Sequence, residues 1–343
     1  MTETTAFRAV ALQTTCRAIT PCRSVDEARE QIVKNIERVG RQIPSTIAWT
    51  GPDTRLIVLP EYLLTGFPTR ETAEEWIAKA CLSEGCAELE ALGAIAEKSR
   101  IFLAGNAYEH DRHFPKIFFQ TSFVIDPSGD VVLRYRRLNS MYSPTPHDVW
   151  DAYVDRYGLD GVFPVARTEI GRIGAVASEE ILYPELSRCL AMRGTEIFVH
   201  STCEVGSPRA TPKGIAKRAR AIENLAYVVS ANTAGMDGLD LPSASADGMS
   251  CVIDFKGKVM AEAGTGESCV AAADIDLDAL RRFRRRPGME NLLSRQRFEA
   301  YATSYAEHRH YPANTMANGF DGRAHFVRTQ AKVIERLAKK GVI

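Results

Sequence analysis

The stretch GRIGAVASEEILYPELSRCLAMRG, residues 171–194, carries the clearest fold signal in this chain. It begins as an apolar run typical of a buried strand, turns at Ser178, and continues over residues 184–193 with apolar residues at helical spacing. A buried strand followed by a turn and a helix is a building unit of α/β proteins. Polar residues at Ser178, Glu179 and Glu180 therefore fall at a strand end, where such sheets place their chemistry.

Strands and helices alternate on both sides of this stretch. Further strands are predicted for FRAVALQ (7–13), RLIVLPEY (55–62), IFLAGNAYE (101–109), EIFVHS (196–201), AYVVSANTAG (226–235) and VAAADIDL (270–277). Hairpins are predicted for residues 118–138 and 250–264, and helices for 24–43 and 213–225. This order indicates an α/β fold in which helices cover a mixed sheet.

The domain organisation follows from where this alternation stops. The strands and helices continue to about residue 285 without a linker rich in Pro, Gly or Ser, which predicts one domain over residues 1–285. Residues 286–343 have weaker apolar patterning but many aromatic side chains. We expect this segment to be a C-terminal extension that packs on a partner subunit, in a homodimer or a higher homo-oligomer.

The composition excludes several classes of function. The chain has 343 residues, 45% of them hydrophobic, and its 43 Lys and Arg balance its 43 Asp and Glu. This balance argues against nucleic acid or an anionic membrane as partner and favours a small neutral ligand. There is no secretion signal and no apolar run of about 18 residues, so a cytoplasmic location is expected. The eight cysteines show no CxxC pairing and are expected to be reduced thiols.

Several polar residues lie directly after apolar runs. Glu61 follows RLIVLP, Arg136 and Arg137 follow VVLRY, Ser178 follows RIGAVA, and His200 follows EIFV. Each one alone is also compatible with a structural role, as a helix cap, a solvated arginine pair or a hydrogen-bonded core histidine. Because all of them lie at strand ends, the alternative hypothesis is that they share one site.

Three segments together resemble the nitrilase, or carbon–nitrogen hydrolase, superfamily. They are LIVLPEYLLTGFP (56–68), FVIDPSGDVVLRYRRL (123–138) and IGAVASEEILYPELSRCLAMRG (173–194), and residues 218–235 and 248–264 match the segments that follow in that family. The stretches YPELSRCLAMRG and ANTAGMDG look most like the aliphatic amidase and formamidase branch. The resemblance implies an αββα sandwich, with four layers formed when two subunits pack.

The resemblance also implies roles for individual residues, and two of them depart from the family pattern. Glu61 takes the position of the general base, whereas Ser178 stands where the family has its nucleophilic cysteine and Arg137 where it has a lysine. A further family glutamate has no clear match; residues 138–150 offer Thr145, His147 and Asp148 instead.

The chemistry expected of these residues is acyl transfer at a small amide or nitrile. The hydroxyl at Ser178 would attack the carbonyl, Glu61 would carry the proton to the leaving amine, and Arg137 with the backbone N–H of Glu179 would hold the oxyanion. His200 is a candidate for a replacement base, because an alcohol is harder to activate than a thiol. No metal or organic cofactor is required, and the cysteines and histidines show no metal-ligand spacing.

Three accounts of Ser178 remain open from the sequence. In the first account Ser178 is an introduced Cys→Ser change, which the presence of Arg137 disfavours. In the second account the chain is a diverged hydrolase with a serine nucleophile. In the third account the chain keeps the pocket as a binding module for an amide-like ligand and has lost turnover.

Overall fold

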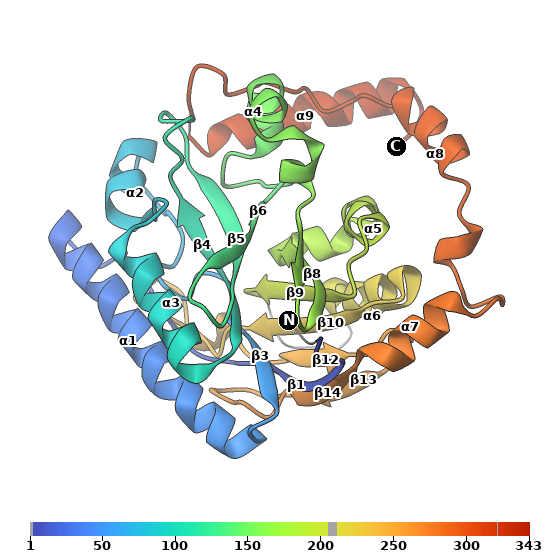
Figure 1. Cartoon of the computed structure of the whole chain (residues 1–343). Coiled ribbons are helices and arrows are strands. Elements are labelled where there is room, and N and C mark those ends of the chain that lie inside the picture. Colours follow the sequence, from blue (N-terminus) through green and yellow to red (C-terminus); the bar gives the residue numbers. More distant parts are fainter. Residues whose placement is uncertain (1–2, 205–210, 321) are drawn as a thin grey trace.

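Two six-stranded sheets form the centre of the protein in a computed structural model, which describes residues 3–204, 211–320 and 322–343 (Figure 1). The first sheet has the order β14 (Ala272–Asp276), β1 (Ala6–Ala11), β3 (Thr54–Val58), β4 (Phe102–Glu109), β5 (Phe119–Ile125) and β6 (Val131–Arg136). The second has the order β13 (Val259–Glu262), β12 (Cys251–Ile253), β10 (Tyr227–Asn232), β9 (Ile197–Thr202), β8 (Gly171–Ala177) and β7 (Val165–Thr168). A small ladder pairs β2 (Cys16–Arg17) with β11 (Met236–Asp237).

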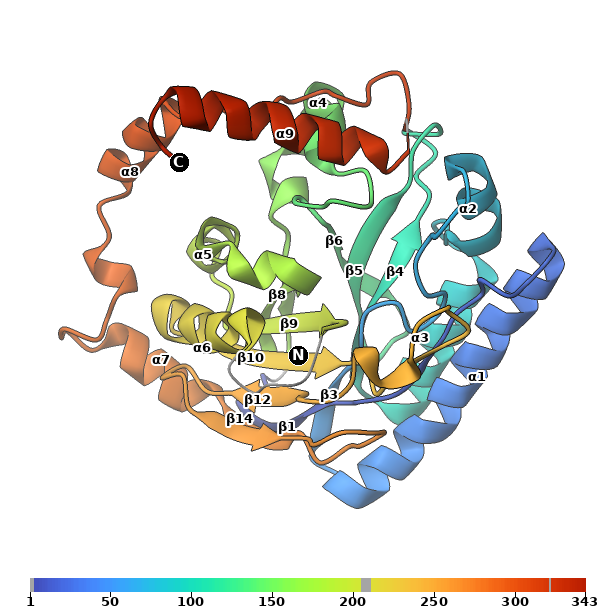
Figure 2. The same ribbon diagram turned by 180° about the vertical axis from the view of Figure 1, so that it is seen from behind.

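Helices cover the outer face of each sheet (Figures 1 and 2). Helices α1 (Val25–Thr50), α2 (Ala73–Ala80) and α3 (Ala87–Ser99) lie on the first sheet, and α5 (Pro184–Met192) and α6 (Pro212–Asn224) lie on the second. The predicted αββα sandwich is confirmed. However, all four layers come from a single chain, whereas the resemblance had implied that two subunits form them.

The central strands are buried on both faces, and each face packs in a different hydrophobic cluster. In β1, Ala9 and Ala11 point into the core between the sheets, while Val10 packs in a separate cluster with Ile36 and Val39 of α1. Side chains alternate across a strand, so a strand that is buried on both faces reads as a continuous apolar run. This explains why the runs at residues 7–13 and 55–62 show no hydrophobic and polar alternation.

Helix α1 is longer than the sequence predicts. It continues past residue 43 to Thr50 and contains Pro44, which removes one backbone hydrogen bond from the helix. Thr46 and Thr50 stay buried, so the buried stripe of the helix continues beyond the proline. Tertiary packing therefore overrides the local signal for a helix end.

The parallel strands bring the carboxyl ends of the two sheets together. In the second sheet β8 is parallel to β9, with Ala177 opposite Ser201; in the first sheet β3 is parallel to β4. The Ser201 hydroxyl donates to the carbonyl of Leu59 at 2.7 Å, and the Glu61 N–H donates to the carbonyl of Thr202 at 3.4 Å. These bonds tie the segment after β3 to the end of β9.

The C-terminal residues form two contrasting helices. In α9 (Ala324–Lys339), Phe326 is fully buried in a cluster of this chain that contains Phe114 and Tyr153, a residue of α4 (Trp150–Val162). Every residue of α8 (Phe298–Ala306), which follows α7 (Leu277–Arg285), is partly or fully exposed. Part of the extension thus packs on its own domain. None of the helices in the described ranges is long and apolar enough to cross a membrane.

Candidate active site

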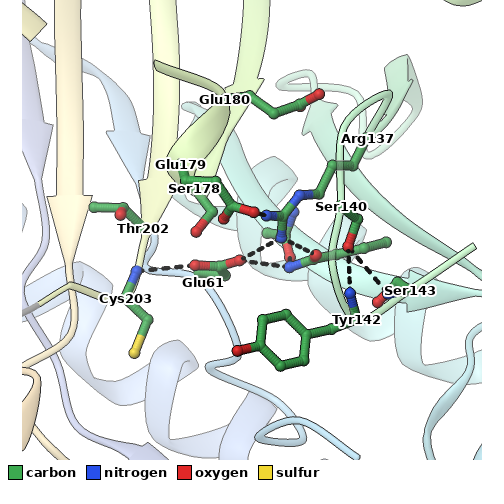
Figure 3. Close-up of polar contacts among 12 residues, drawn as sticks. Glu61, Arg137, Ser140, Tyr142, Ser143, Ser178, Glu179, Glu180, Thr202 and Cys203 are labelled. Carbon is green, nitrogen blue, oxygen red and sulfur yellow. Dashed lines mark hydrogen bonds and ion pairs between the residues drawn. The ribbon is translucent and has the colours of Figure 1, made fainter. Parts of the chain in front are cut away.

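Glu61 lies at the centre of a buried polar cluster between the sheets (Figure 3). Its carboxylate accepts hydrogen bonds from the Gln120 amide at 2.6 Å and from the Cys203 backbone N–H at 2.9 Å. Burial raises the pKa of the Glu61 carboxyl, and the positive charges of Arg137 and Lys213 oppose that rise. A carboxyl that is held by fixed donors and shifted toward neutrality is suited to general acid and base chemistry.

Arg137 comes directly after β6, and its side chain is almost completely buried. Its guanidinium donates to Gln120 Oε1 at 2.6 Å and to the Asn139 carbonyl at 2.8 Å, and Nη1 lies 3.5 Å from Glu61 Oε1. Nη2 pairs with the carboxylate of Glu179. The planar fork of arginine therefore joins Glu61 to the turn after β8, through hydrogen bonds from Nε and Nη1 and an ion pair at Nη2.

Ser178 is the first residue after β8 and is held in a left-handed backbone conformation, with φ of 51°. Few residues other than glycine adopt this conformation, and it is found where a sharp strand-to-helix turn presents a nucleophile. The Ser178 hydroxyl oxygen lies 3.5 Å from Lys213 Nζ, and a hydrogen bond from this hydroxyl lowers the pKa of Glu61. Of the residues that the sequence placed at strand ends, Glu61, Arg137 and Ser178 thus converge in one site, whereas the Arg136 guanidinium pairs with Glu109 and Asp111 instead.

His200 contributes to this turn through the backbone. It lies inside β9 rather than at its end, and its Nε2 is 2.8 Å from the carbonyl oxygen of Ser178, while Nδ1 is 2.8 Å from the Ser230 hydroxyl. A carbonyl only accepts, so Nε2 carries the proton. Burial, reinforced by Lys217, holds the pKa of His200 well below its ordinary value. The structure therefore places a neutral imidazole against the main chain of Ser178, and not at its hydroxyl.

The two glutamates after Ser178 have different surroundings. Glu179 is partly exposed and pairs with Arg137. Glu180 is fully buried and accepts hydrogen bonds from the Tyr135 hydroxyl at 2.6 Å and from the backbone N–H of Leu138 and Asn139 at 2.9 and 2.7 Å. Burial raises the pKa of Glu180 to about 7. Glu180 thereby ties the segment after β6 to the turn that carries Ser178.

Asp148 is not brought to this cluster. It lies in the short 3-10 helix η1 (Pro146–Val149) and accepts hydrogen bonds from the backbone and hydroxyl of Thr145 at 2.9 and 2.8 Å, and from the Thr315 hydroxyl at 2.6 Å. Among the described residues, none of its hydrogen bonds runs to Glu61, Arg137 or Ser178. Its position in this structure is that of a capping residue which anchors the C-terminal extension.

Two further residues, which no sequence motif marks, complete the cluster. Gln120, from β5, bridges Glu61 and Arg137; the available signal was a run of three polar residues, Gln120, Thr121 and Ser122, between apolar strand residues. Lys213 lies in the first turn of α6 and donates to the Thr202 hydroxyl at 3.3 Å as well as to Ser178. No local motif marks Lys213, because its neighbours in the site come from distant strands.

Comparison with known protein families identifies the chain. Residues 13–285 match the model of the carbon–nitrogen hydrolase family. The chain belongs to the carbon–nitrogen hydrolase family. The matched region contains the strands of both sheets except β1, and it includes Glu61, Arg137, Ser178 and Lys213, so the polar cluster lies inside the family domain. The matched region ends with α7, before the C-terminal extension.

Curated relatives and solved structures agree with this family. A formamidase from Bacillus cereus (strain AH820) is 29% identical over 223 residues, which cover 63% of this chain and 60% of that relative. The chain thus aligns with less than two thirds of the length of the formamidases that it matches. Nit3 of Saccharomyces cerevisiae, described as a member of the nitrilase superfamily, superposes with a TM-score of 0.65 at 20% identity, covering 82% of this chain and 94% of Nit3. An amidase from Nesterenkonia sp. superposes with a TM-score of 0.60 at 19% identity, over 87% and 96% of the two chains. The structural matches show the same fold, and two of these proteins are named as a formamidase and an amidase.

Proposed function

We propose that this carbon–nitrogen hydrolase cleaves a small amide by acyl transfer to Ser178, with Glu61 as the general base. The observation that carries the proposal is the position of the Ser178 hydroxyl, which faces Glu61 and Lys213 from a left-handed turn at the end of β8. A nucleophile beside a base that fixed donors orient is the arrangement that acyl transfer requires. The formamidase relatives support an amide as the substrate class.

The steps of the reaction follow from these positions. The Ser178 oxygen attacks the amide carbonyl while its proton passes to Glu61, and the backbone N–H of Glu179 stabilises the oxyanion. The carbon–nitrogen bond then breaks as Glu61 returns the proton to the leaving amine, which leaves an ester on Ser178. Water then attacks the ester carbonyl while Glu61 accepts its proton, and Glu61 returns this proton to the Ser178 oxygen as the carbon–oxygen bond breaks and the acid leaves. Each proton and each bond is accounted for by groups of the site and water.

The role that we propose for Arg137 differs from the one that the family resemblance implies. Partners within the protein occupy its guanidinium, so we propose that it positions Glu61 and the turn after β8 instead of binding the oxyanion. Its charge still lowers the pKa of Glu61. We assign His200 a similar positioning role, because it holds the carbonyl of Ser178.

A direct test combines product release with trapping of the acyl intermediate. The protein is incubated with formamide, acetamide, propionamide and the matching nitriles, and ammonia release is measured. In parallel, a short-chain activated ester is added, and intact-mass and peptide mass spectrometry locate the acyl group. We expect slow amide turnover and acylation at Ser178, both abolished in Ser178→Ala. Amide turnover that survives Ser178→Ala would overturn the assignment of the nucleophile.

A second candidate function is binding of an amide-like ligand without turnover. The engagement of Arg137 by Glu179 and Gln120 favours it, because this cation is then unavailable to a tetrahedral intermediate. An alcohol is also a weaker nucleophile than the thiolate expected in the family. Calorimetric binding of an amide with neither ammonia release nor acylation of Ser178 would support this candidate over hydrolysis.

We also propose that the C-terminal extension, residues 286–343, contributes to an interface between copies of the chain. Its helix α8 carries Tyr301 and Tyr305 with 46% and 59% of their surfaces exposed. Aromatic side chains of this size are usually buried against another surface. Light scattering on the chain and on a Tyr301→Ser, Tyr305→Ser double variant tests this proposal. We expect a dimer or larger assembly that the double variant weakens, and a well-folded wild-type monomer at micromolar concentration would contradict it.

A further inference from the structure

Lys213 and Arg137, the two cations of the site, have different kinds of partners. Its Nζ lies 3.5 Å from the Ser178 hydroxyl oxygen and 3.3 Å from the Thr202 hydroxyl oxygen. Within the part of the chain that the structure describes, these two hydroxyls are its hydrogen-bond partners, and it forms no ion pair there. Arg137, by contrast, pairs with the carboxylates of Glu61 and Glu179. Lys213 is therefore the cation whose charge is directed at the nucleophile.

The start of α6 holds Lys213 firmly in this place. Thr211 caps the helix by accepting a hydrogen bond from the Gly214 N–H at 3.0 Å, and Pro212 occupies the first helical position. Further along the helix, Arg220 Nε donates to the carbonyl of Ile181 at 3.1 Å. Helix α6 is thus bonded to the same turn that presents Ser178. This fixes the start of α6 relative to the turn, within reach of the Lys213 side chain.

Helix stability does not explain a lysine at this position. The N-terminus of a helix carries a partial positive charge, so a lysine in the first turn is unfavourable there, and the first turn of α6 has no acidic residue to offset it. Conflicts between local preference and the observed residue are expected at functional sites. The Lys213 ammonium instead places positive charge beside the hydroxyl of Ser178.

We propose that Lys213 is a catalytic residue of this site, whose ammonium stabilises the negative charge that forms on the Ser178 oxygen. This inference rests on the proposed role of Ser178 as the nucleophile. It addresses the main difficulty of that role, which is that an alcohol loses its proton less readily than a thiol. Glu61 accepts the proton, and Lys213 lowers the free energy of the alkoxide that remains.

The first measurement does not depend on amide turnover. A fluorophosphonate reacts with an activated serine: the serine oxygen bonds to phosphorus, fluoride leaves, and the hydroxyl proton passes to Glu61. We expect Ser178 to be labelled in the wild type and the labelling rate to fall about a hundredfold in Lys213→Met. Lys34→Met is the control, because Lys34 is exposed on α1 and its loss removes the same charge far from the site. Lys213→Gln serves as the second variant if Lys213→Met folds poorly.

The second measurement separates a chemical role from a structural one. A thiol has a pKa near 8.5 and needs less help to ionise, so in a Ser178→Cys background Lys213→Met should slow alkylation of residue 178 by chloroacetamide less than about tenfold. A merely structural role would slow both backgrounds equally. Arg137 and Lys213 both lower the pKa of Glu61, whereas Glu179 raises it. The acidic limb of the labelling rate should therefore move to higher pH in Lys213→Met.

The outcomes separate the proposed role of Lys213 from the proposed hydrolysis of an amide. If Ser178 is labelled but no amide or nitrile is hydrolysed, the proposed function fails while the role of Lys213 is still tested by the labelling rates. The inference is overturned if Lys213→Met labels within about threefold of the wild-type rate. It is likewise overturned if the loss is equal in the serine and cysteine backgrounds, or if wild-type Ser178 is not labelled at all.

Discussion

The end of β6 and the start of α6 each bring one cation to Glu61, and the two cations are used in opposite ways. Arg137, at the end of β6, is 1% exposed and bonded to Gln120, to the Asn139 carbonyl and to two carboxylates. Lys213, at the start of α6, is half-buried and faces the hydroxyls of Ser178 and Thr202. The first charge is neutralised within a network that holds the site together. The second remains directed at the group that we propose to react.

This difference shows that the sign of a side chain's charge does not define its role in a site. Arg137 keeps the positive charge that the family resemblance expects at its position, yet carboxylates and amides occupy its donors. A guanidinium can satisfy several planar acceptors at once, whereas an ammonium is a compact point charge. Arg137 therefore holds the residues of the site together, and we call this network of contacts the framework. The following variants test this division, from the largest expected effect to the smallest.

Glu61 lies between the two regions, so its removal should affect both. In Glu61→Gln the proton acceptor is lost while the hydrogen bond from Gln120 has an acceptor of similar shape. We expect acylation of Ser178 to fall about a thousandfold, the range usual for loss of a general base. Ester labelling followed by mass spectrometry measures the rate, and circular dichroism checks the fold. Retention of most of the activity would mean that another group takes the proton.

The two cations should separate when stability is measured. Arg137→Met leaves Glu61 and Glu179 without their buried partner, and we expect the free energy of unfolding to fall by about 3 to 5 kcal/mol. Lys213→Met removes a half-buried charge without an ion pair among the described residues, and we expect a change of less than about 1 kcal/mol. Urea denaturation of both variants provides the comparison. Equal losses of stability would remove the distinction between framework and reactive cation.

Glu180 should make the framework side sensitive to pH. Its pKa is raised from 4.5 to about 7 by burial, so the folded protein holds a proton that the unfolded chain releases. The stability due to this proton is complete below pH 4.5 and is lost as the pH rises through about 7, a loss of up to about 3 kcal/mol. In Glu180→Gln this dependence should disappear. Urea denaturation at pH 5, 6, 7 and 8 tests it, and an unchanged slope in the variant would contradict the assignment.

Restoring the residue types that the family resemblance expects should have the smallest effect. In the Ser178→Cys, Arg137→Lys double variant, the thiol is easier to activate, but lysine cannot reproduce the planar contacts of Arg137. We therefore expect amide hydrolysis to increase only about tenfold over the wild type. Ser178→Cys alone is the matched control. If the double variant greatly exceeds this control, the native contacts of Arg137 limit catalysis more than they support it.

The sequence by itself determined the fold class, the family resemblance and the placement of three site residues. For Glu61 and Ser178 the reason is physical: strands that are buried on both faces are continuous apolar runs, so the polar residue that follows each run marks a strand end. Arg137 follows β6, an edge strand that is only partly buried, and the family resemblance indicated its place in the site. The predicted helix from residue 184 and the hairpin at residues 118–138 are also confirmed, because the sequence signals for a helix start and for a tight turn are local.

Only the tertiary structure decided how these residues contact one another. His200 belongs to an apolar strand whatever its role, and only the position of β8 relative to β9 directs its Nε2 to a backbone carbonyl. Asp148 is near the expected glutamate in sequence, but its cap on η1 directs it to Thr145. Lys213 carries no motif, because its contact with Ser178 joins residues 35 apart in sequence. Contacts of this kind depend on how two sheets and a helix pack, and packing is a property of the whole chain.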